Sequence, residues 1–160
     1  MKRLLKGGRV VSASGVVEAD VLLNDEKIEK VGKNIDESGV EIIDVGGKLL
    51  FPGFIDAHTH FDLHVAGTVT ADDFRTGTRA ALRGGTTTIV DFGTQYAGET
   101  LMEGLKNWHE KADGKCSCDY GFHMSISDWN HDVSREIDKM TEEGINSYKP
   151  VTYKHMTLPT

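Results

Sequence analysis

Apolar β-type runs alternate with amphipathic helical segments from Leu49 onward, and this alternation constrains the fold more than any other feature of the chain. The expected strands are Leu49–Ile55, Thr86–Phe92, Tyr120–Ile126 and Ile145–Lys149, and the expected helices are Ala71–Arg83, Leu101–Ala112 and Val133–Glu143. Thr70 is the expected N-cap of the first helix, because its hydroxyl can accept a hydrogen bond from the first turn. Strands and helices that alternate at this spacing form parallel βαβ units, so we expect an α/β fold.

The first fifty residues follow a different pattern. Short β-type runs are separated by turn signals such as Ser14–Gly15 and Gly46–Gly47, which predicts a small antiparallel β-structure. The runs are Arg9–Val11, Val16–Leu23, Lys27–Val31 and Val40–Asp44. A few short strands are marginally stable alone, so we expect this structure to pack on another part of the protein. The sequence thus divides into a β domain, residues 1–50, and an α/β domain, residues 51–160.

The composition is that of a soluble globular protein with an acidic balance. Of the 160 residues, 38% are hydrophobic and 27% are charged, and the formal net charge is −7. An acidic chain repels nucleic acid and anionic membrane surfaces, which argues against both as main partners. No apolar run approaches the length of a membrane span, and the first residues lack the apolar stretch of a secretory signal. The expected location is therefore the cytoplasm.

The two cysteines, Cys116 and Cys118, stand only one residue apart. Cysteines this close along the chain seldom form a good structural disulfide, and two ligands do not complete a zinc site. We interpret them as part of a loop that leads into the third strand of the α/β domain.

A pair of histidines follows the first strand of the α/β domain, in the sequence Gly53–Phe54–Ile55–Asp56–Ala57–His58–Thr59–His60. In extended backbone, side chains two residues apart lie on the same face, so His58 and His60 should project together. Neutral imidazole is a good zinc ligand, and a zinc ion with open coordination positions can activate water. A lone His-x-His pair also occurs by chance or in solvated loops, so the interpretation depends on the rest of the chain.

Polar side chains also stand at the ends of the other expected strands. Asp91 ends the second strand, His123 lies in the third, and Lys149 ends the fourth. Active sites of parallel α/β folds gather at the carboxyl ends of their strands. We therefore expect Asp91 and Lys149 to share one rim of the sheet with the histidine pair. We interpret His123 as a core or rim residue rather than a ligand.

Taken together, these motifs give Phe51–Lys149 a resemblance to the metal-dependent cyclic amidohydrolases, and within them to the dihydropyrimidinase/D-hydantoinase group. The matching segments are Pro52–His60, Gly67–Phe74, Gly77–Ala81, Gly84–Thr88, Val90–Phe92 and Gly144–Lys149. The resemblance implies a TIM-type (β/α)8 barrel with a part of a small β-sandwich before it. The chain would supply the first three to four βα units, which make an incomplete barrel.

The resemblance also implies a site with a pair of zinc ions. His58 and His60 would bind the more buried zinc, and Lys149 matches the lysine that the family carboxylates to a carbamate bridging both metals. Carboxylation converts a cation into a two-oxygen anion that can join two dications. Asp56 and Asp91 would orient the liganding histidines without touching the metal.

Two further residues have roles in the substrate pocket by the same resemblance. His64 follows the metal motif, in a loop where the family shapes its pocket, although a solvated loop histidine fits the sequence equally well. Tyr153 resembles the tyrosine that donates a hydrogen bond to the developing oxyanion.

The implied reaction is hydrolysis of a cyclic amide C–N bond, in which a dihydropyrimidine or a hydantoin opens to an N-carbamoyl amino acid. Allantoinase and dihydroorotase are the nearest alternatives, and a non-catalytic assembly protein on the same scaffold is an alternative of another class. A small open α/β binding domain is a further alternative. Family members assemble as homotetramers or dimers. Two further metal-binding histidines and a catalytic aspartate would come from strands beyond Thr160, so we expect the 160-residue chain alone to be inactive.

Overall fold

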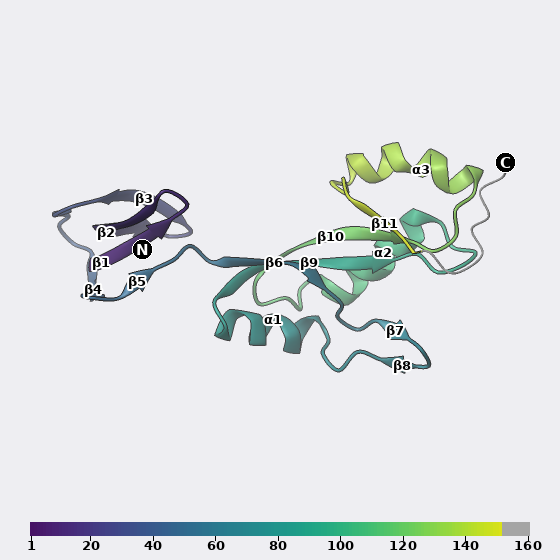
Figure 1. The fold of residues 1–160 in the computed structure, drawn as a ribbon, viewed down its shortest axis with the longest axis horizontal. Helices are drawn as coiled ribbons and strands as arrows, with labels where there is room; N and C mark the ends of the chain where they lie inside the picture. Colours follow the sequence, from purple (N-terminus) through teal and green to yellow (C-terminus); the bar gives the residue numbers. More distant parts are fainter. Residues whose placement is uncertain (152–160) are drawn as a thin grey trace. The chain divides into compact units, whose positions relative to one another are not determined.

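A computed structural model of the chain describes residues 1–151. The backbone divides into two compact units, Met1–Pro52 and Gly53–Thr160. Figure 1 labels the strands and helices in chain order. None of the helices within residues 1–151 is long and apolar enough to cross a membrane.

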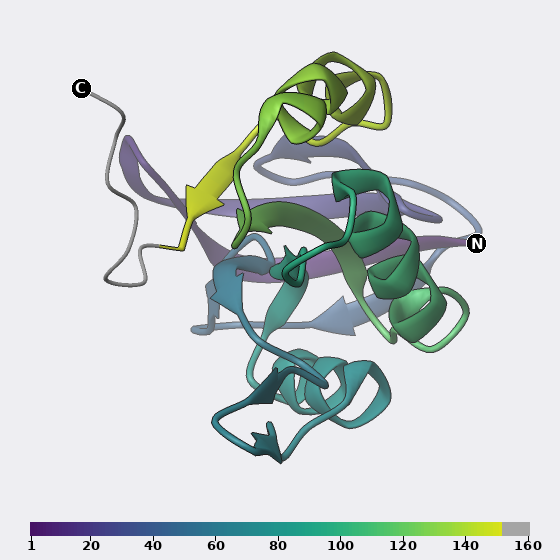
Figure 2. The same ribbon diagram turned by 90° about the vertical axis from the view of Figure 1, so that its right-hand side faces the viewer.

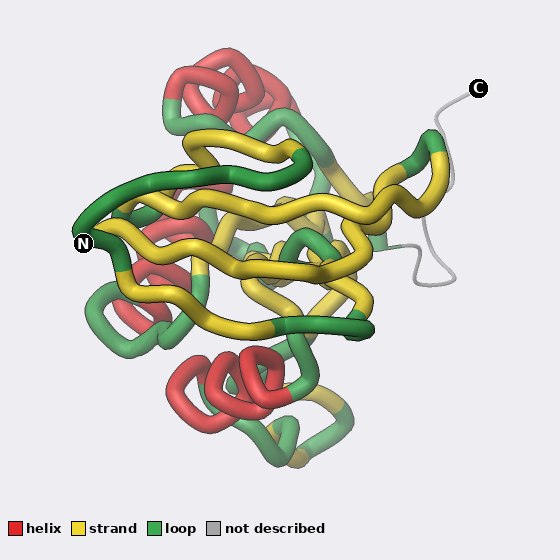
Figure 3. The backbone as a smooth tube through the Cα atoms, turned by 90° about the vertical axis from the view of Figure 1, so that its left-hand side faces the viewer, coloured by secondary structure: helices red, strands yellow, loops and turns green. Residues whose placement is uncertain are grey.

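The first unit is a five-stranded mixed sheet, whose strands run side by side in Figure 3. Its strands are β1 (Lys2–Ser12), β2 (Gly15–Asn24), β3 (Lys27–Gly32), β4 (Glu41–Asp44) and β5 (Leu49–Leu50). β1, β2 and β3 pair antiparallel in succession, whereas β4 and β5 both pair parallel to β1. The expected small antiparallel β-structure is confirmed for β1, β2 and β3 and is wrong for β4 and β5. The connection after β3 crosses the sheet to the free edge of β1 instead of reversing in a hairpin.

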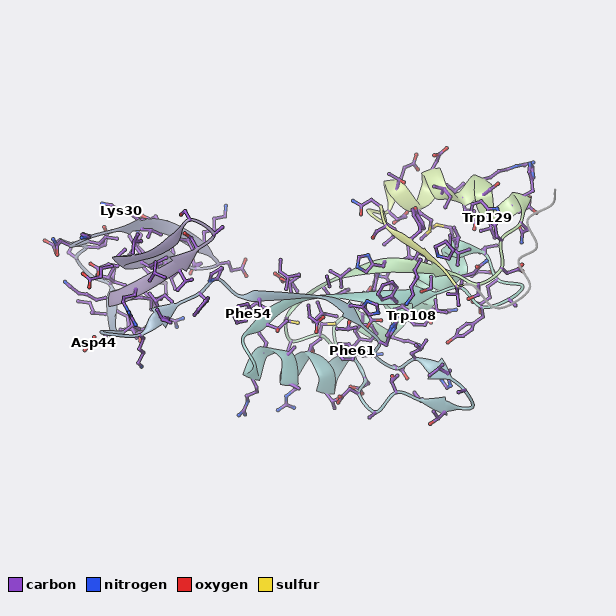
Figure 4. The ribbon with its side chains drawn as sticks, in the orientation of Figure 1. Lys30, Asp44, Phe54, Phe61, Trp108 and Trp129 are labelled. Carbon is purple, nitrogen blue, oxygen red and sulfur yellow. The ribbon has the colours of Figure 1, made fainter. Side chains whose placement is uncertain are left out.

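A small core and one buried carboxylate stabilise this unit. Leu4, Leu22 and Ile35 form the core. The buried carboxylate of Asp20 accepts hydrogen bonds from the backbone N–H groups of Gly7 at 2.8 Å and Ile35 at 3.0 Å. Charged side chains such as those labelled Lys30 and Asp44 in Figure 4 are exposed.

The second unit is built on a four-stranded parallel sheet in the order β11-β10-β9-β6. Its elements are β6 (Phe54–Thr59), β7 (His64–Val65), β8 (Thr68–Val69), α1 (Phe74–Arg83), β9 (Thr86–Thr94), α2 (Leu101–Ala112), β10 (Asp119–Ile126), α3 (His131–Glu142) and β11 (Tyr148–Pro150). The expected parallel α/β fold is confirmed. Figure 2 shows the sheet curled, with α1, α2 and α3 around its convex side. The sequence did not predict the short antiparallel hairpin of β7 and β8.

The hydrophobic core fills the space between the helices and the convex face of the sheet. Its fully buried members include Phe74, Ile89, Leu101, Trp108, Met124 and Met140. Side chains alternate between the two faces of a strand. Asp91 and Phe122 accordingly contact helix residues, whereas Phe92 and His123 contact each other on the concave face.

The strand before the histidine pair differs from the expected Leu49–Ile55. The structure has two strands there, β5 in the first unit and β6 in the second, because Pro52 between them cannot donate a ladder hydrogen bond. The ladder of β6 starts where Phe54 N–H donates to the carbonyl of Gly85 at 2.9 Å. His58 therefore lies within β6, and His60 comes directly after it.

The first helix begins at Phe74, later than the expected Ala71, and its N-cap is Asp73 and not Thr70. Asp73 Oδ1 accepts a hydrogen bond from the backbone N–H of Thr76 at 2.7 Å, and Thr76 Oγ1 accepts one from Asp73 N–H at 3.1 Å. This reciprocal pair is a capping box. Thr70 Oγ1 accepts instead from the backbone N–H of Leu63 at 3.0 Å, which closes the loop around the β7–β8 hairpin.

Helix α1 contacts the segment after the histidine pair through a glycine. A Cβ atom added at Gly77 would lie 2.2 Å from Cε1 of Phe61, so the bare backbone lets this ring approach the helix. We predict that Gly77→Ala lowers the midpoint of urea unfolding. Alanine is favoured over glycine in a helix by about 1 kcal/mol, but forcing a ring out of its packed position costs about 1–3 kcal/mol.

The matched control is Ala80→Gly, at an exposed position of the same helix. It should lower the midpoint through helix propensity alone. If propensity governed both sites, the two substitutions would shift the midpoint in opposite directions, and a higher midpoint for Gly77→Ala would contradict the packing argument.

Candidate metal site

Four side chains surround the ring of Phe92 on the concave face of the sheet. The ring centroids of His58, His60 and His123 lie 4.5, 5.1 and 4.8 Å from that of Phe92. The Nζ atom of Lys149 lies 4.8 Å from the same centroid. These residues come from or directly follow β6, β9, β10 and β11, so all four strands of the parallel sheet contribute to one cluster.

The two histidines of the His-x-His motif have different surroundings. Their ring centroids are 5.1 Å apart with an interplanar angle of 82°. His58 is exposed, whereas His60 is partly buried, and its Nδ1 atom makes no hydrogen bond within residues 1–151. Burial lowers the pKa of His60; Asp91 opposes this shift, while His58 and Lys149 add to it. Burial thus favours the neutral form of His60, which is the form that metal ions bind, and its Nδ1 lacks a hydrogen-bond partner within the described residues.

Lys149 is exposed in β11, and its ammonium group lies over the Phe92 ring as a cation–π pair. An ammonium has three donors and no acceptor, so it cannot bind a metal without chemical modification. Within residues 1–151, no group of three or more His, Cys, Asp or Glu side chains is arranged to hold a metal ion. The described rim offers three imidazoles and one amine, but both ring nitrogens of His123 already bond protein groups. The imidazoles of His58 and His60 and the amine of Lys149 remain as donors. This donor set fits a metal site once the amine becomes an anion.

Asp91 anchors the segment that carries His60. Its fully buried carboxylate accepts hydrogen bonds from Thr59 Oγ1 at 2.7 Å, from Phe61 N–H at 2.9 Å and from Trp108 Nε1–H at 2.9 Å. Burial raises the pKa of Asp91, and these three donors oppose the shift. The residues on both sides of His60 are therefore tied to helix α2. In Figure 4 the labelled Phe61 and Trp108 lie near each other, between the labels of Phe54 and Trp129.

The remaining predicted site residues lie in different places. Asp56 Oδ1 accepts a hydrogen bond from the backbone N–H of His58 at 3.2 Å, so it contacts the backbone and not the imidazole. His64 is exposed in β7 and lines a cavity of about 490 Å³ together with Tyr96 and Lys111 of the helix-covered side. Tyr153 lies outside the described residues.

Two residues of this region, Phe92 and Trp108, carried no specific role in the sequence interpretation, whereas His123 lies at the rim, one of the two places expected for it. Phe92 is the centre of the rim cluster, Trp108 holds Asp91, and His123 joins the cluster from β10. Strand alternation places Phe92 and His123 on one face and could have identified them. In the sequence, Trp108 has the position of an ordinary apolar residue on an amphipathic helix. Nothing in the sequence indicates that its indole N–H donates to Asp91.

The cysteines are separate from this cluster. Cys116 and Cys118 are free thiols just before β10, which agrees with the interpretation of a loop leading into a strand. Burial raises the pKa of Cys116 to about 11. Both residues are therefore unlike the low-pKa thiolates that bind metals.

The chain is similar to known proteins over nearly its whole length. Over 150 residues the chain is 51% identical to a D-hydantoinase of Geobacillus stearothermophilus, covering 93% of the chain and 32% of that protein. It is 42% identical over 160 residues to a dihydropyrimidinase of Dictyostelium discoideum, covering 98% of the chain and 32% of that protein. The crystal structure of dihydropyrimidinase from Brevibacillus agri has a TM-score of 0.92 at 45% identity, covering 100% of the chain and 35% of that structure.

The chain spans about a third of the length of these curated relatives. The model of the amidohydrolase family matches residues 49–148, a segment that starts at β5 and ends at the first residue of β11. It therefore includes the strand and loop that carry His58 and His60, and also Asp91, Phe92 and His123. On this match, the chain belongs to the amidohydrolase family.

Proposed function

We propose that a protein of its relatives' length containing this chain hydrolyses a cyclic amide C–N bond, opening a hydantoin or dihydropyrimidine ring to an N-carbamoyl amino acid. The names of the relatives support this substrate class. The observation that carries the proposal is the grouping of His58, His60 and Lys149 around Phe92 at the carboxyl ends of parallel strands. A small cyclic ureide as substrate, the cytoplasm as location, and a homotetramer or dimer as assembly belong to the same proposal.

The proposed cofactor is a pair of zinc ions. The chemistry that zinc supplies when bound is Lewis-acid polarisation of the ring carbonyl and a lower pKa for a water molecule. His58 and His60 would each give one imidazole nitrogen to the more buried ion. The buried Nδ1 of His60, which has no hydrogen bond within residues 1–151, supports this assignment.

Lys149 would add a carbamate to the donors that this chain supplies. Its neutral Nζ attacks carbon dioxide, one N–C bond forms, and a proton leaves, so the product is an anion with two oxygens. The position of Nζ over Phe92, beside both histidines, supports this role. Asp91 would hold the ligand segment in place through Thr59 and Phe61.

Two substrate contacts complete the proposal. Tyr153 would donate a hydrogen bond to the oxygen of the carbonyl under attack, where developing charge makes such a donor effective. His64 would line the substrate pocket; the cavity of about 490 Å³ beside it is lined by residues of the helix-covered side and by none of the rim cluster, so it does not bear on this role.

The direct test is turnover by the native-length protein after metal removal and after reconstitution with zinc. We expect hydrolysis of hydantoin or dihydrouracil to disappear with chelation and to return with zinc. Replacing either ligand, His58→Asn or His60→Asn, should abolish it. The control His131→Asn, at an exposed position at the start of α3, should leave it unchanged. The 160-residue chain alone should be inactive.

Two results would contradict the assignment. Preferred hydrolysis of allantoin or dihydroorotate would move the protein to a neighbouring activity of the same family. The absence of both zinc binding and turnover in the native-length protein would favour a non-catalytic assembly protein.

Carboxylation of Lys149 has its own measurement. We predict that zinc reconstitution in the presence of ¹³C-bicarbonate gives a carbamate signal in the ¹³C NMR spectrum of the protein. Lys149→Arg should remove this signal and the zinc that depends on it, because an arginine does not form the carbamate under these conditions. Lys106→Arg, at a lysine whose side chain is 76% exposed, is the matched control and should retain both. A carbamate signal that survives Lys149→Arg would assign the modification elsewhere.

The anchoring role of Asp91 predicts a change in metal affinity. Asp91→Asn keeps the shape of the side chain but turns an NH₂ group toward at least one of three buried donors. Zinc affinity, measured by competition with a chromophoric chelator, should fall about 10- to 100-fold, as for other residues that orient metal ligands. The control Asp113→Asn alters an exposed carboxylate that accepts from Tyr120 and should leave affinity unchanged. Equal affinities for both variants would refute the anchor.

A further inference from the structure

His123 makes a connection that spans the sheet. It lies on β10, whose ladder partners are β9 and β11. Its Nε2 atom nevertheless lies 3.1 Å from the carbonyl oxygen of Ala57 in β6, one strand beyond β9. Its Nδ1 atom bonds the hydroxyl of Ser147, the residue before β11. Among the described residues, β6 and β11 are the edge strands of this sheet, so one imidazole links the edge strand β6 to the residue that precedes β11.

The chemistry of the partners sets the direction of both hydrogen bonds. A carbonyl oxygen can only accept, so Nε2–H donates to Ala57. A neutral imidazole has one N–H, so its Nδ1 accepts from the hydroxyl of Ser147. The ring is also packed on Phe92, which fixes its plane. The Ala57–His123–Ser147 connection, here called the strap, therefore fixes the tautomer and the orientation of the side chain.

Both ends of the strap adjoin the proposed metal ligands. Ala57 directly precedes His58, and Ser147 lies two residues before Lys149, on the same side of an extended segment. The ladders of β9 and β10 separate these two ligand segments in the sheet. Within the described residues, the strap is a side-chain bridge that joins the two segments across that gap.

We propose that His123 is a positioning residue, which holds the His58–His60 segment and Lys149 at the separation that metal binding requires. This inference rests on the proposed function, because that function makes His58, His60 and Lys149 the ligands. Metal-bridged sites tolerate little change in ligand spacing, and groups that orient ligands commonly affect affinity about 10- to 100-fold.

Three substitutions in the native-length protein separate the parts of the strap. His123→Phe keeps a ring over Phe92 and removes both hydrogen bonds. His123→Gln places an amide N–H near the position of Nε2, so it keeps the bond to Ala57 alone. Ser147→Ala removes only the other end. The control His109→Gln alters a histidine of α2 that bonds Asp113.

The first readout is amide hydrogen exchange of the metal-free protein, followed by mass spectrometry. We expect His123→Phe to speed exchange about 5- to 10-fold in segments 54–60 and 145–151, as the loss of about one net hydrogen bond would, and to leave α2 unchanged. His123→Gln and Ser147→Ala should speed exchange in 145–151 alone. A merely structural residue would not give this segment-specific pattern.

The second readout is zinc affinity by competition. His123→Phe should weaken it about 10- to 100-fold, with His123→Gln between that variant and the wild type. Unchanged affinity in His123→Phe would overturn the inference, and so would faster exchange spread equally over α2. If the wild type binds no zinc through His58 and His60, the proposed function and the positioning role both fail. In that case, amide hydrogen exchange of the metal-free protein separately tests the strap, through faster exchange of segments 54–60 and 145–151 in His123→Phe.

Discussion

A buried carboxylate fixes the segment on which the candidate site depends. Backbone that leaves the end of a strand has no ladder to hold it, and His60 lies at such a point. Asp91 accepts hydrogen bonds from the residues on both sides of His60 and from Trp108 of α2. Leaving a buried hydrogen-bonding group without its partner costs about 1–3 kcal/mol, and more when the group is charged. The ligand segment and the helical core are therefore coupled.

The two faces of the sheet have different roles: the convex face packs against the helices in the core, and the concave face carries the candidate metal ligands. On the convex face, Asp91 and Phe122 join the helices in a packed core. On the concave face, Phe92 and His123 gather the histidine pair and Lys149 from strands that are not all neighbours. The consecutive residues Asp91 and Phe92 of β9 thus point to opposite faces, as side chains alternate along a strand, so one belongs to the core and the other to the rim cluster. The apolar ring of Phe92 keeps the polar groups around it close together.

Periodicity predicted the parallel α/β unit and the convergence of polar residues at strand ends, because parallel strands bring their carboxyl ends to one rim. It could not choose between two good N-caps, since the contact of Thr70 with Leu63 is tertiary and leaves Asp73 to cap α1. It also could not give strand direction in the first unit, because a sequence run does not specify which edge it joins. The sequence also could not predict the strap of His123, because this connection requires a curled sheet that brings Ala57 near His123 across β9.

The central claim is that a metal binds at the rim formed by His58 and His60. X-ray absorption at the zinc edge of the native-length protein tests it most directly. The account predicts imidazole nitrogen and oxygen neighbours at about 2.0–2.1 Å, with the imidazole contribution reduced in the His58→Asn variant. A sulfur shell at about 2.3 Å would show thiolate ligands in place of the imidazoles and would contradict the account.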